Sequence, residues 1–328
     1  MVPVKNILVT GGAGYLGSVL VRKLVARNFN VTVIDKMLFD TKTLNRFKDD
    51  IRIYKEDIRN DKEISKIFKK NKIDCVIHLA ALVGDGICNI HPQEAVEINY
   101  LATKSLLDIV RENKVRKFLF ASTCSVYGFS DKLLKETDKV TPVSVYSMTK
   151  TQAEEAVLDK SGPNFSTTVF RMATLYGLSL RMRFDLVMNY FTAQAALGEK
   201  ITLWAGYQWR PFIHVEDAAE AYILALDKSE KLINGQVFNL AGNSQNYQIY
   251  QVADLVKKII PKSEIERDEK KMEPRNYKVD TKKIQRILKF RPHKIIRDGI
   301  YEIYQAIHKD RRFVNYRSSK YTNFLKKV

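Results

Sequence analysis

Tyr146 and Lys150 are the pair in this chain that best fits acid–base chemistry, because they stand four residues apart in Tyr146-Ser147-Met148-Thr149-Lys150. Side chains four residues apart lie on one face of a helix, so the phenol and the ammonium can share a site. A free tyrosine, with a pKa of ~10, is a poor base at neutral pH. A neighbouring positive charge lowers that pKa and lets the phenolate accept a proton from an alcohol. Taken alone, the same spacing also fits an exposed pair on a solvated helix.

A second set of polar side chains follows the apolar run Phe118-Leu119-Phe120-Ala121 and comprises Ser122, Thr123, Cys124 and Ser125. The apolar run predicts a buried strand, and ligands of parallel sheets bind at the carboxyl ends of the strands. A hydroxyl at this edge can hydrogen-bond a reacting oxygen and orient it. The alternative is a turn that is merely rich in serine and threonine.

The elements that must position these groups begin with a glycine-rich turn, Thr10-Gly11-Gly12-Ala13-Gly14-Tyr15-Leu16-Gly17. An apolar strand pattern, 7–9, precedes it and a helical pattern follows, and such a turn brings backbone N–H groups and a helix dipole to a pyrophosphate. The next predicted strand ends in Asp35, near the usual distance for a carboxylate that binds ribose hydroxyls. A carboxylate there repels the extra phosphate of NADP and favours NAD, although Lys36 weakens that preference. The positive nicotinamide ring would add to the effect of Lys150 on Tyr146.

Strand and helix patterns alternate through about residue 170, which predicts an α/β fold with a doubly wound parallel sheet. The expected strands are 4–10, 31–35, 51–55, 74–80, 117–122 and 166–171, and the expected helices are 15–27, 61–70, 93–113 and 146–160. Beyond Gly177 we expect a smaller mixed lobe, with helices 185–197, 215–227, 247–259, 280–288 and 295–308 and strands 201–204 and 236–240. We therefore divide the chain into a cofactor-binding domain, 1–175, and a substrate lobe, 176–328, intertwined with it.

Composition limits the classes of function. The 328 residues are 45% hydrophobic and 28% charged, as in ordinary globular proteins. The three cysteines show no paired spacing, which favours a reducing, cytoplasmic compartment, and the five scattered histidines suggest no metal site. No apolar run is long enough for a membrane span. The net charge of +18 fits anionic substrates, and nucleic acid is not expected because no aromatic RNA-binding signature is present. The basic tail, which includes Arg311, Arg312, Arg317, Lys320, Lys326 and Lys327 with Tyr316, Tyr321 and Phe324, can touch a partner subunit or an anionic surface.

Together the motifs resemble the extended short-chain dehydrogenase/reductases, a family of nucleotide-sugar epimerases, dehydratases and dehydrogenases with a Rossmann-type domain. The resemblance runs through nearly the whole chain. Besides the glycine turn and the Tyr146/Lys150 pair, it includes Asp57-Ile58, H-L-A-A at 78–81, Asn99, S-T-C-S-V-Y-G at 122–128, R-M-A-T-L-Y-G at 171–177, R-P-F-I-H-V-E-D at 210–217 and R-N-Y-K-V-D at 275–280.

The resemblance implies three sets of site residues. NAD would be bound by Gly11, Gly14, Tyr15, Leu16, Gly17, Asp35, Lys36, Asp57, Ile58, Leu79, Ala80, Ala81, Asn99, Tyr146 and Lys150. Catalysis would rest on Thr123, Tyr146 and Lys150. The nucleotide-diphosphate sugar would be held by Thr123, Cys124, Ser125, Thr174, Arg183, Asn189, Arg210 and Arg275, with Arg210 and Arg275 on its diphosphate. The resemblance also implies a homodimer that pairs helices 93–113 and 146–160.

Departures from the family pattern narrow the chemistry. Sugar 4,6-dehydratases of the family follow the catalytic threonine with Asp-Glu, whereas this chain has Cys124 and Ser125, which disfavours dehydration. A cysteine can serve as acid/base in epimerisation beside a ketone, but a buried neutral Cys124 is the other interpretation. The run L-R-M-R-F-D-L-V-M-N at 180–189, together with A-A-L-V-G at 80–84 and R-N-Y at 275–277, resembles a subgroup that includes the GDP-heptose 4-dehydrogenases of capsule synthesis.

Two classes of function remain. The first is an NAD-dependent nucleotide-sugar epimerase or dehydrogenase that oxidises a hydroxyl, at carbon 4, of a hexose or heptose for surface-polysaccharide or activated-sugar synthesis; 4,6-dehydratase or 4-ketoreductase activity is the alternative within this class. The second is an NAD-binding scaffold whose basic surface binds RNA or another anion. The Tyr146/Lys150 pair argues for the enzyme, because a pure binding protein does not need it.

Overall fold

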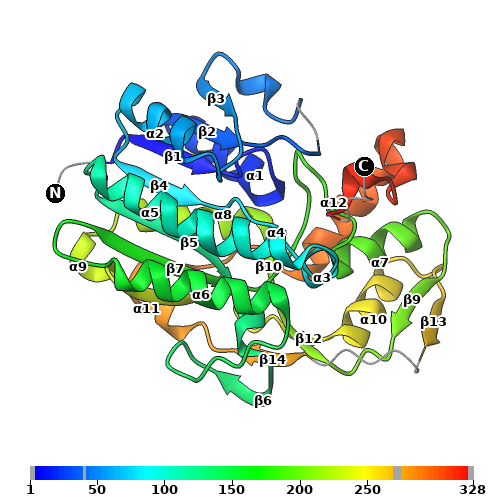
Figure 1. Ribbon diagram of the computed structural model, residues 1–328. Helices are drawn as coiled ribbons and strands as arrows, with labels where there is room; N and C mark the ends of the chain where they lie inside the picture. Colours follow the sequence, from blue (N-terminus) through cyan, green and yellow to red (C-terminus); the bar gives the residue numbers. More distant parts are fainter. Residues whose placement is uncertain (1–3, 40–41, 269–274, 324–328) are drawn as a thin grey trace.

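A seven-stranded parallel sheet forms the centre of the computed structural model, which describes residues 4–39, 42–268 and 275–323 (Figure 1). The strands lie in the order β11-β7-β5-β4-β1-β2-β3, and every neighbouring pair is parallel. Their bounds are β1 Asn6–Thr10, β2 Asn30–Asp35, β3 Ile51–Lys55, β4 Cys75–His78, β5 Lys117–Thr123, β7 Ser166–Met172 and β11 Gln236–Leu240. The predicted doubly wound α/β architecture is confirmed.

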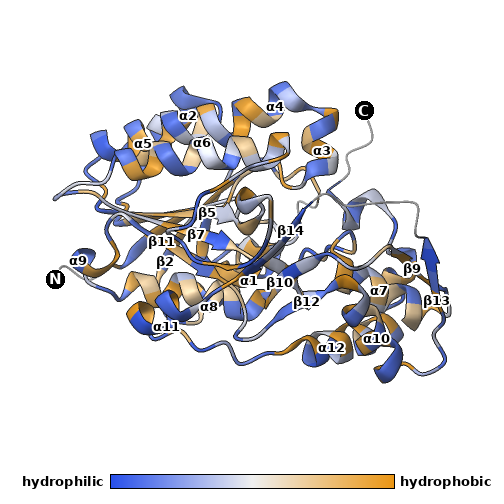
Figure 2. Ribbon diagram, turned by 90° about the horizontal axis from the view of Figure 1, so that it is seen from below, coloured by the Kyte–Doolittle hydropathy of each residue, from blue (hydrophilic) through white to orange (hydrophobic). Residues whose placement is uncertain are grey.

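Helices cover both faces of this sheet (Figure 2). One face carries α2 (Asp61–Lys70), α5 (Ala102–Glu112) and α6 (Val145–Asp159), and the other carries α1 (Tyr15–Val25), α8 (Val215–Leu226) and α11 (Lys282–Leu288). Within β1, Leu8 packs into the hydrophobic core on the α2, α5 and α6 side of the sheet, while Ile7 and Val9 pack into the core on the α1 and α8 side. A strand buried on both faces must be apolar at successive positions, which is why β1 appears in the sequence as an unbroken apolar run.

The order of the strands reverses between β1 and β4. The chain runs outward from β1 to β2 and β3, and then returns to the other side of β1 with β4, β5 and β7. In open parallel sheets the crevice at such a reversal, outside the carboxyl ends of the strands, is where ligands bind. Thr10, His78 and Thr123 end the three strands concerned, so the glycine turn and the hydroxyl cluster meet at this edge.

The helix expected at 93–113 is interrupted. In the structure it consists of α4 (Pro92–Val96), a π-helical turn (Glu97–Leu101) and α5, and α3 (Asp85–Ile90) precedes it. Asn99 lies in the π turn, fully buried, and its side-chain amide pairs with the backbone N–H and carbonyl of Leu82 at 2.7 and 3.0 Å. The wider turn thereby fastens the helix to the loop that follows β4, a use of π turns that often accompanies functional sites.

A smaller lobe lies beside the carboxyl edge of the sheet (Figure 1). Its helices are α7 (Val187–Ala196), α10 (Ile249–Ile259) and α12 (Ile296–Lys309). Three small sheets accompany them: β8 (Thr174–Tyr176) with β10 (Trp209–His214) and β12 (Asn246–Gln248), β9 (Ile201–Trp204) with β13 (Ile265–Asp268), and β6 (Phe129–Leu134) with β14 (Asn276–Val279). The short α9 (Glu230–Ile233) precedes β11. The chain after residue 176 thus builds most of this lobe, with β6 and β8 added from earlier in the chain, and also returns to the large sheet with α8, β11 and α11.

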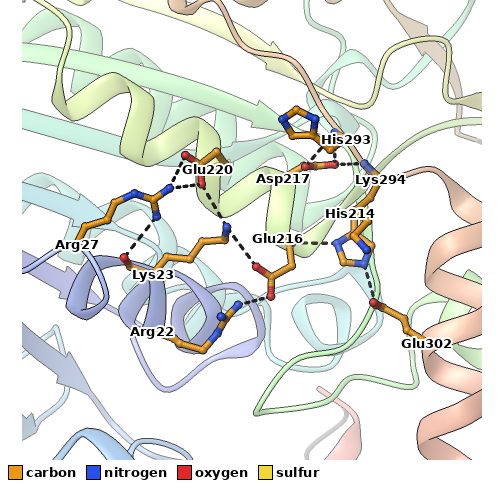
Figure 3. Close-up of polar contacts among 10 residues, drawn as sticks. All are labelled: Arg22, Lys23, Arg27, His214, Glu216, Asp217, Glu220, His293, Lys294 and Glu302. Carbon is orange, nitrogen blue, oxygen red and sulfur yellow. Dashed lines mark hydrogen bonds and ion pairs between the residues drawn. The ribbon is translucent and has the colours of Figure 1, made fainter.

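Part of the excess positive charge is used in holding α1 against α8 (Figure 3). Arg22 and Lys23 of α1, and Arg27 just after this helix, face Glu216 and Glu220 of α8. The Lys23 Nζ lies 3.3 and 3.2 Å from the two carboxylates, and the Arg27 guanidinium lies 2.8 Å from Glu220. These basic residues follow the glycine turn on or just after the same helix, so they anchor the element that carries that turn.

The described part of the basic tail packs against the lobe. The Phe184 ring contacts the rings of Phe313, Tyr316 and Tyr321, with centroid distances of 5.6, 5.8 and 5.7 Å, and we call these four rings the aromatic cluster. The Arg317 guanidinium donates to Glu199 at 3.0 Å. Phe324, Lys326 and Lys327 lie outside the described residues. None of the helices in the ranges above is long and apolar enough to cross a membrane.

Candidate active site

A pocket opens at the β1/β4 reversal, and its wall combines the expected cofactor residues with two arginines from the smaller lobe. The lining residues are Gly11, Ala13–Gly17, Asp35–Phe39, Glu56–Ile58, Leu79–Val83, Ile98, Ala121, Tyr146, Lys150, Met172, Leu175, Arg181, Arg183 and Asn323. Asn99 does not line the pocket, because its amide is turned to Leu82 and Thr149 behind the wall.

The glycine turn forms a cradle that only glycine can form. Gly11 has φ +71°, and a Cβ there would lie 2.7 Å from the backbone nitrogen of Ala80. A Cβ on Gly17 would lie 2.1 Å from the Gly11 carbonyl oxygen. The first turn of α1 carries no acidic side chain, so its free N–H groups and positive dipole end face the pocket without a competing anion. This cradle fits the diphosphate of a dinucleotide.

Asp35 stands at the end of the pocket where a ribose would bind. Its carboxylate accepts hydrogen bonds from the backbone N–H of Ala13 at 2.9 Å and of Met37 at 2.7 Å. Burial raises the pKa of Asp35, while these two bonds and the charge of Arg181 oppose the rise. The carboxylate is therefore fixed in position and turned toward the pocket wall.

Asp57, expected beside the adenine, belongs to a charged group that includes a residue the sequence analysis missed. Lys36 Nζ lies 3.0 Å from Asp57, and the Arg59 guanidinium lies 2.7 Å from it. Burial opposes ionisation of Asp57, but the hydrogen bonds from Arg59 and Lys36 outweigh it and hold its pKa well below the usual range. Arg59 could have been found from the sequence, because it stands two residues after Asp57 and can pair with its carboxylate.

Tyr146 lies at the start of α6 because a capping box begins that helix. The Ser147 backbone N–H donates to Ser144 Oγ at 3.2 Å, and the Ser144 N–H donates to Ser147 Oγ at 3.0 Å. Tyr146 is 9% exposed and lies close to Thr123, whose hydroxyl is 2.9 Å from that of Ser125. The structure thus brings the predicted threonine near the predicted tyrosine, and of the two Tyr146 lines the pocket while Thr123 does not.

The electrostatics at Tyr146 differ from those expected. Burial raises the pKa of Tyr146, Cys88 and Asp85 add to the rise, and Arg183 and the Thr123 hydrogen bond lower it. Arg183 is the cation that favours the phenolate in the structure. Lys150 Nζ instead lies over the Phe120 ring, 4.1 Å from its centroid. Burial lowers the pKa of Lys150 to about 7, against the opposing charge of Glu154.

A buried ion pair supports the floor beneath these residues. Glu154, one turn after Lys150, accepts a hydrogen bond from Ser122 and pairs with Arg171 at 2.8 Å. Both charged side chains are almost fully buried. Arg171 also donates to the Tyr127 hydroxyl at 3.0 Å. The network fixes the end of β5, and with it Thr123, against α6.

Four of the expected substrate residues lie at three places in the structure. Arg183 lines the pocket and pairs with Asp185. Arg210 and Arg275 lie together at another place: Arg210 donates to the Arg275 carbonyl at 2.6 Å, and Arg275 pairs with Asp85, which accepts a hydrogen bond from Ser144 at the start of α6. Thr174, in β8, pairs in register with Phe212.

Two of the expected substrate residues are turned away from the pocket. Asn189 is fully buried and donates to the Tyr15 hydroxyl at 3.1 Å and to the Arg183 carbonyl at 2.8 Å. Cys124 is 1% exposed, and its thiol donates to the Arg171 carbonyl at 3.1 Å. Burial raises the pKa of Cys124, so the reactive thiolate is disfavoured.

Comparisons with known proteins agree with this geometry. The model of the NAD dependent epimerase/dehydratase family matches residues 7–241. The chain is 30% identical over 272 residues to a UDP-glucose 4-epimerase of Halalkalibacterium halodurans, covering 77% of this chain and 80% of the relative. It is 29% identical over 320 residues to a UDP-N-acetyl-alpha-D-glucosaminuronate decarboxylase of Bacillus cytotoxicus, covering 92% and 97%.

A solved structure shares the fold over nearly the whole length. The UDP-glucuronic acid 4-epimerase of Bacillus cereus, in complex with UDP-glucuronic acid and NAD, superimposes with a TM-score of 0.82 at 26% identity, covering 93% of this chain and 99% of that one. Because the glycine cradle, Asp35 and the paired hydroxyls stand where the family model matches, the chain belongs to the NAD-dependent epimerase/dehydratase family, and its cofactor is NAD.

Proposed function

We propose that this enzyme is a nucleotide-sugar 4-epimerase that oxidises and re-reduces carbon 4 of a nucleotide-diphosphate hexose. The observation that carries the proposal is that Tyr146 lines the NAD pocket beside the glycine cradle and lies close to Thr123, which lowers the pKa of Tyr146. A sugar alcohol between these side chains and the cofactor would lose its proton to Tyr146 in the phenolate form while Thr123 orients its oxygen. When bound, NAD accepts a hydride from the sugar carbon and can return it.

The charged residues around Tyr146 suit this role. Arg183, which lines the pocket, lowers the pKa of Tyr146. The phenolate that accepts the alcohol proton is therefore more populated than it would be if burial acted alone. After oxidation Tyr146 holds the proton, and Tyr146 gives this proton back to the same oxygen when the ketone is reduced. Inversion requires only that the keto sugar turn its other face toward the cofactor before the hydride is returned.

Two arginines near the start of α6 are the candidates for binding the diphosphate of the sugar nucleotide. Arg275 and Arg210 are joined to each other and, through Asp85 and Ser144, to the helix that presents Tyr146. Guanidinium groups bind diphosphates through two parallel hydrogen bonds, so an anion there would place a sugar toward Tyr146. We assign most NAD contacts to residues 1–175 and most sugar-nucleotide contacts to residues 176–328.

Two further properties belong to the same proposal. Several exposed apolar side chains lie on the helices expected at the dimer interface, among them Val96, Leu101 and Met148, whereas Leu106 and Leu107 are buried against the sheet. This exposed set supports a homodimer through α4–α5 and α6. The three cysteines are buried and unbridged, which supports the reducing compartment of the cytoplasm.

The relatives named above act on UDP-linked sugars, which makes a UDP-hexose the first substrate to test. Cys124 and Ser125 provide no carboxylate beside Thr123, so we do not propose the dehydratase. A heptose substrate and a net dehydrogenase remain predictions from the sequence.

The test is to incubate the purified enzyme and NAD with UDP-, GDP-, CDP- and dTDP-sugars while following NADH absorbance and the sugar products by NMR. An inverted sugar without net NADH supports the 4-epimerase, and accumulating NADH would identify a dehydrogenase instead. Tyr146→Phe should abolish turnover in a folded enzyme that still binds NAD. If no donor reacts and this variant behaves as wild type in every assay, the scaffold interpretation replaces the enzyme.

A further inference from the structure

Arg181 has an unused hydrogen-bond donor at the wall of the cofactor pocket. Its side chain is 4% exposed and lines the pocket together with the glycine turn and Asp35. Its Nη2 donates to the Thr322 carbonyl at 3.0 Å, while its buried Nε has no partner in the structure. The guanidinium carbon lies 3.9 Å from the centroid of the Phe39 ring, which holds the plane of the group in place.

The segment that precedes Arg181 is hydrogen-bonded directly to Tyr15, the first residue of α1. The Tyr15 hydroxyl donates to the Gly177 carbonyl at 2.5 Å, and Ser179 Oγ donates to the Tyr15 carbonyl at 2.6 Å. Tyr15 is the first residue of α1, so residues 177–181 are held at a fixed distance from the N-terminus of that helix.

His214 and Glu302, which pair with each other in Figure 3, also hold the same turn. His214 Nδ1 accepts from the Glu216 N–H at 3.2 Å, which leaves its Nε2–H to donate to Glu302 at 2.7 Å. The same Glu302 oxygen accepts the Leu178 N–H at 2.6 Å. The turn is therefore fixed by both sets of contacts before any ligand binds, and Arg181 needs little further ordering.

The charge of Arg181 is incompletely balanced. Burial lowers its pKa to about 10, Arg183 adds to the fall, and Asp185 and Asp35 oppose it. Asp185 is already paired with Arg183, and the Asp35 carboxylate already accepts two backbone hydrogen bonds. A buried cation with a free N–H is costly unless an anion completes it. The cofactor brings its diphosphate to the N-terminus of α1 in this pocket.

We propose that Arg181 is a cofactor-binding residue that donates from Nε to the diphosphate of NAD. The smaller lobe then supplies a cation across the pocket from the glycine turn, and the diphosphate is bound from both sides. This role differs from those given to Arg183, Arg210 and Arg275, because it concerns the cofactor and needs no sugar.

The test measures binding of adenosine, AMP, ADP and NAD to the cofactor-free chain by calorimetry, in wild type, Arg181→Met and Arg181→Lys. Loss of one charge-assisted hydrogen bond predicts that Arg181→Met binds ADP and NAD about 10- to 100-fold more weakly, with adenosine unchanged. Arg181→Lys keeps the charge but loses the Nε donor, and should fall between the two. Arg27→Met is the matched control, because it removes a positive charge that lies just after α1 and outside the pocket lining.

Either of two results overturns the proposal. Unchanged ADP affinity in Arg181→Met would show that the diphosphate does not use this side chain, and an equal loss for adenosine would show that Arg181 acts on the nucleoside or on the shape of the pocket. If Arg181→Met does not fold, Arg181→Lys decides, and wild-type ADP affinity there refutes the proposal. No sugar is present, so failure of the proposed epimerase activity does not affect the outcome.

Discussion

Replacing Lys150 by methionine should make the cofactor-free protein more stable at neutral pH, although the residue lies in the proposed catalytic site. Burial lowers the pKa of Lys150 from 10.5 to about 7. Between these values the unfolded chain binds a proton that the folded chain does not, so the free energy of unfolding rises with pH through this window. At and below pH 7 the folded protein bears the full cost of the buried ammonium.

The size of the effect follows from two opposing terms. Each pH unit between the two pKa values is worth about 1.4 kcal/mol, so the buried charge costs folding about 5 kcal/mol at pH 7 and below. The contact of Nζ with the Phe120 ring returns about 0.5–2 kcal/mol and is lost in the variant. Lys150→Met should therefore raise the free energy of unfolding by about 3–4 kcal/mol at pH 6.5.

Urea unfolding at intervals between pH 6.5 and 9.5 measures this difference. The advantage of Lys150→Met should shrink by about 1.4 kcal/mol per pH unit above pH 7, because the wild-type lysine is then neutral in the folded state. Lys160→Met, at the end of the same helix, removes a lysine paired with Asp108 at the surface and should show no such slope. A variant less stable than wild type at pH 6.5, or a difference independent of pH, would refute the reasoning.

Three other substitutions probe the site and its supports. Glu154→Gln leaves the Arg171 guanidinium buried without its carboxylate and should lower the free energy of unfolding by about 3–5 kcal/mol in urea, whereas the exposed neighbour Glu155→Gln should change it little. Gly17→Ala places a Cβ against the backbone of the glycine turn, so NAD affinity measured by calorimetry should fall about 10-fold or more while the far-UV circular dichroism is kept. Phe184→Ala empties the middle of the aromatic cluster and should cost about 3–5 kcal/mol in thermal or urea unfolding, and a loss below about 1 kcal/mol would mean that the tail is held by other contacts.

Features set by local spacing could be predicted from the sequence. The glycine turn between strand and helix, Asp35 at the next strand end, and Tyr146 near Thr123 all depend on short-range patterns or on the rule that parallel strands end at one edge. The π turn at Asn99 was not predicted, because its apolar pattern is that of an ordinary helix. The sequence of a five-residue strand such as β11 does not tell whether the strand joins a large sheet or a small one.

Residues that act through distant partners could not be predicted. The Glu154–Arg171 pair joins α6 to β7, and the sequence shows only two charged residues in separate elements. Arg183 lowers the pKa of Tyr146, and the sequence did not predict this contribution because Arg183 lies far along the chain. Which cation lies near a phenol depends on how the two lobes close, and periodicity carries no information about that.

The position of β11 has a consequence for how the chain is made. β7 is buried at every residue but its last, its outer edge is covered by β11, and α1 is covered by α8. During synthesis from the N-terminus, the first 175 residues emerge with an open strand edge and an uncovered helix face, both of which invite association with other chains. We expect that a fragment ending there aggregates, and that a nascent chain depends on chaperones until residue 240 has left the ribosome.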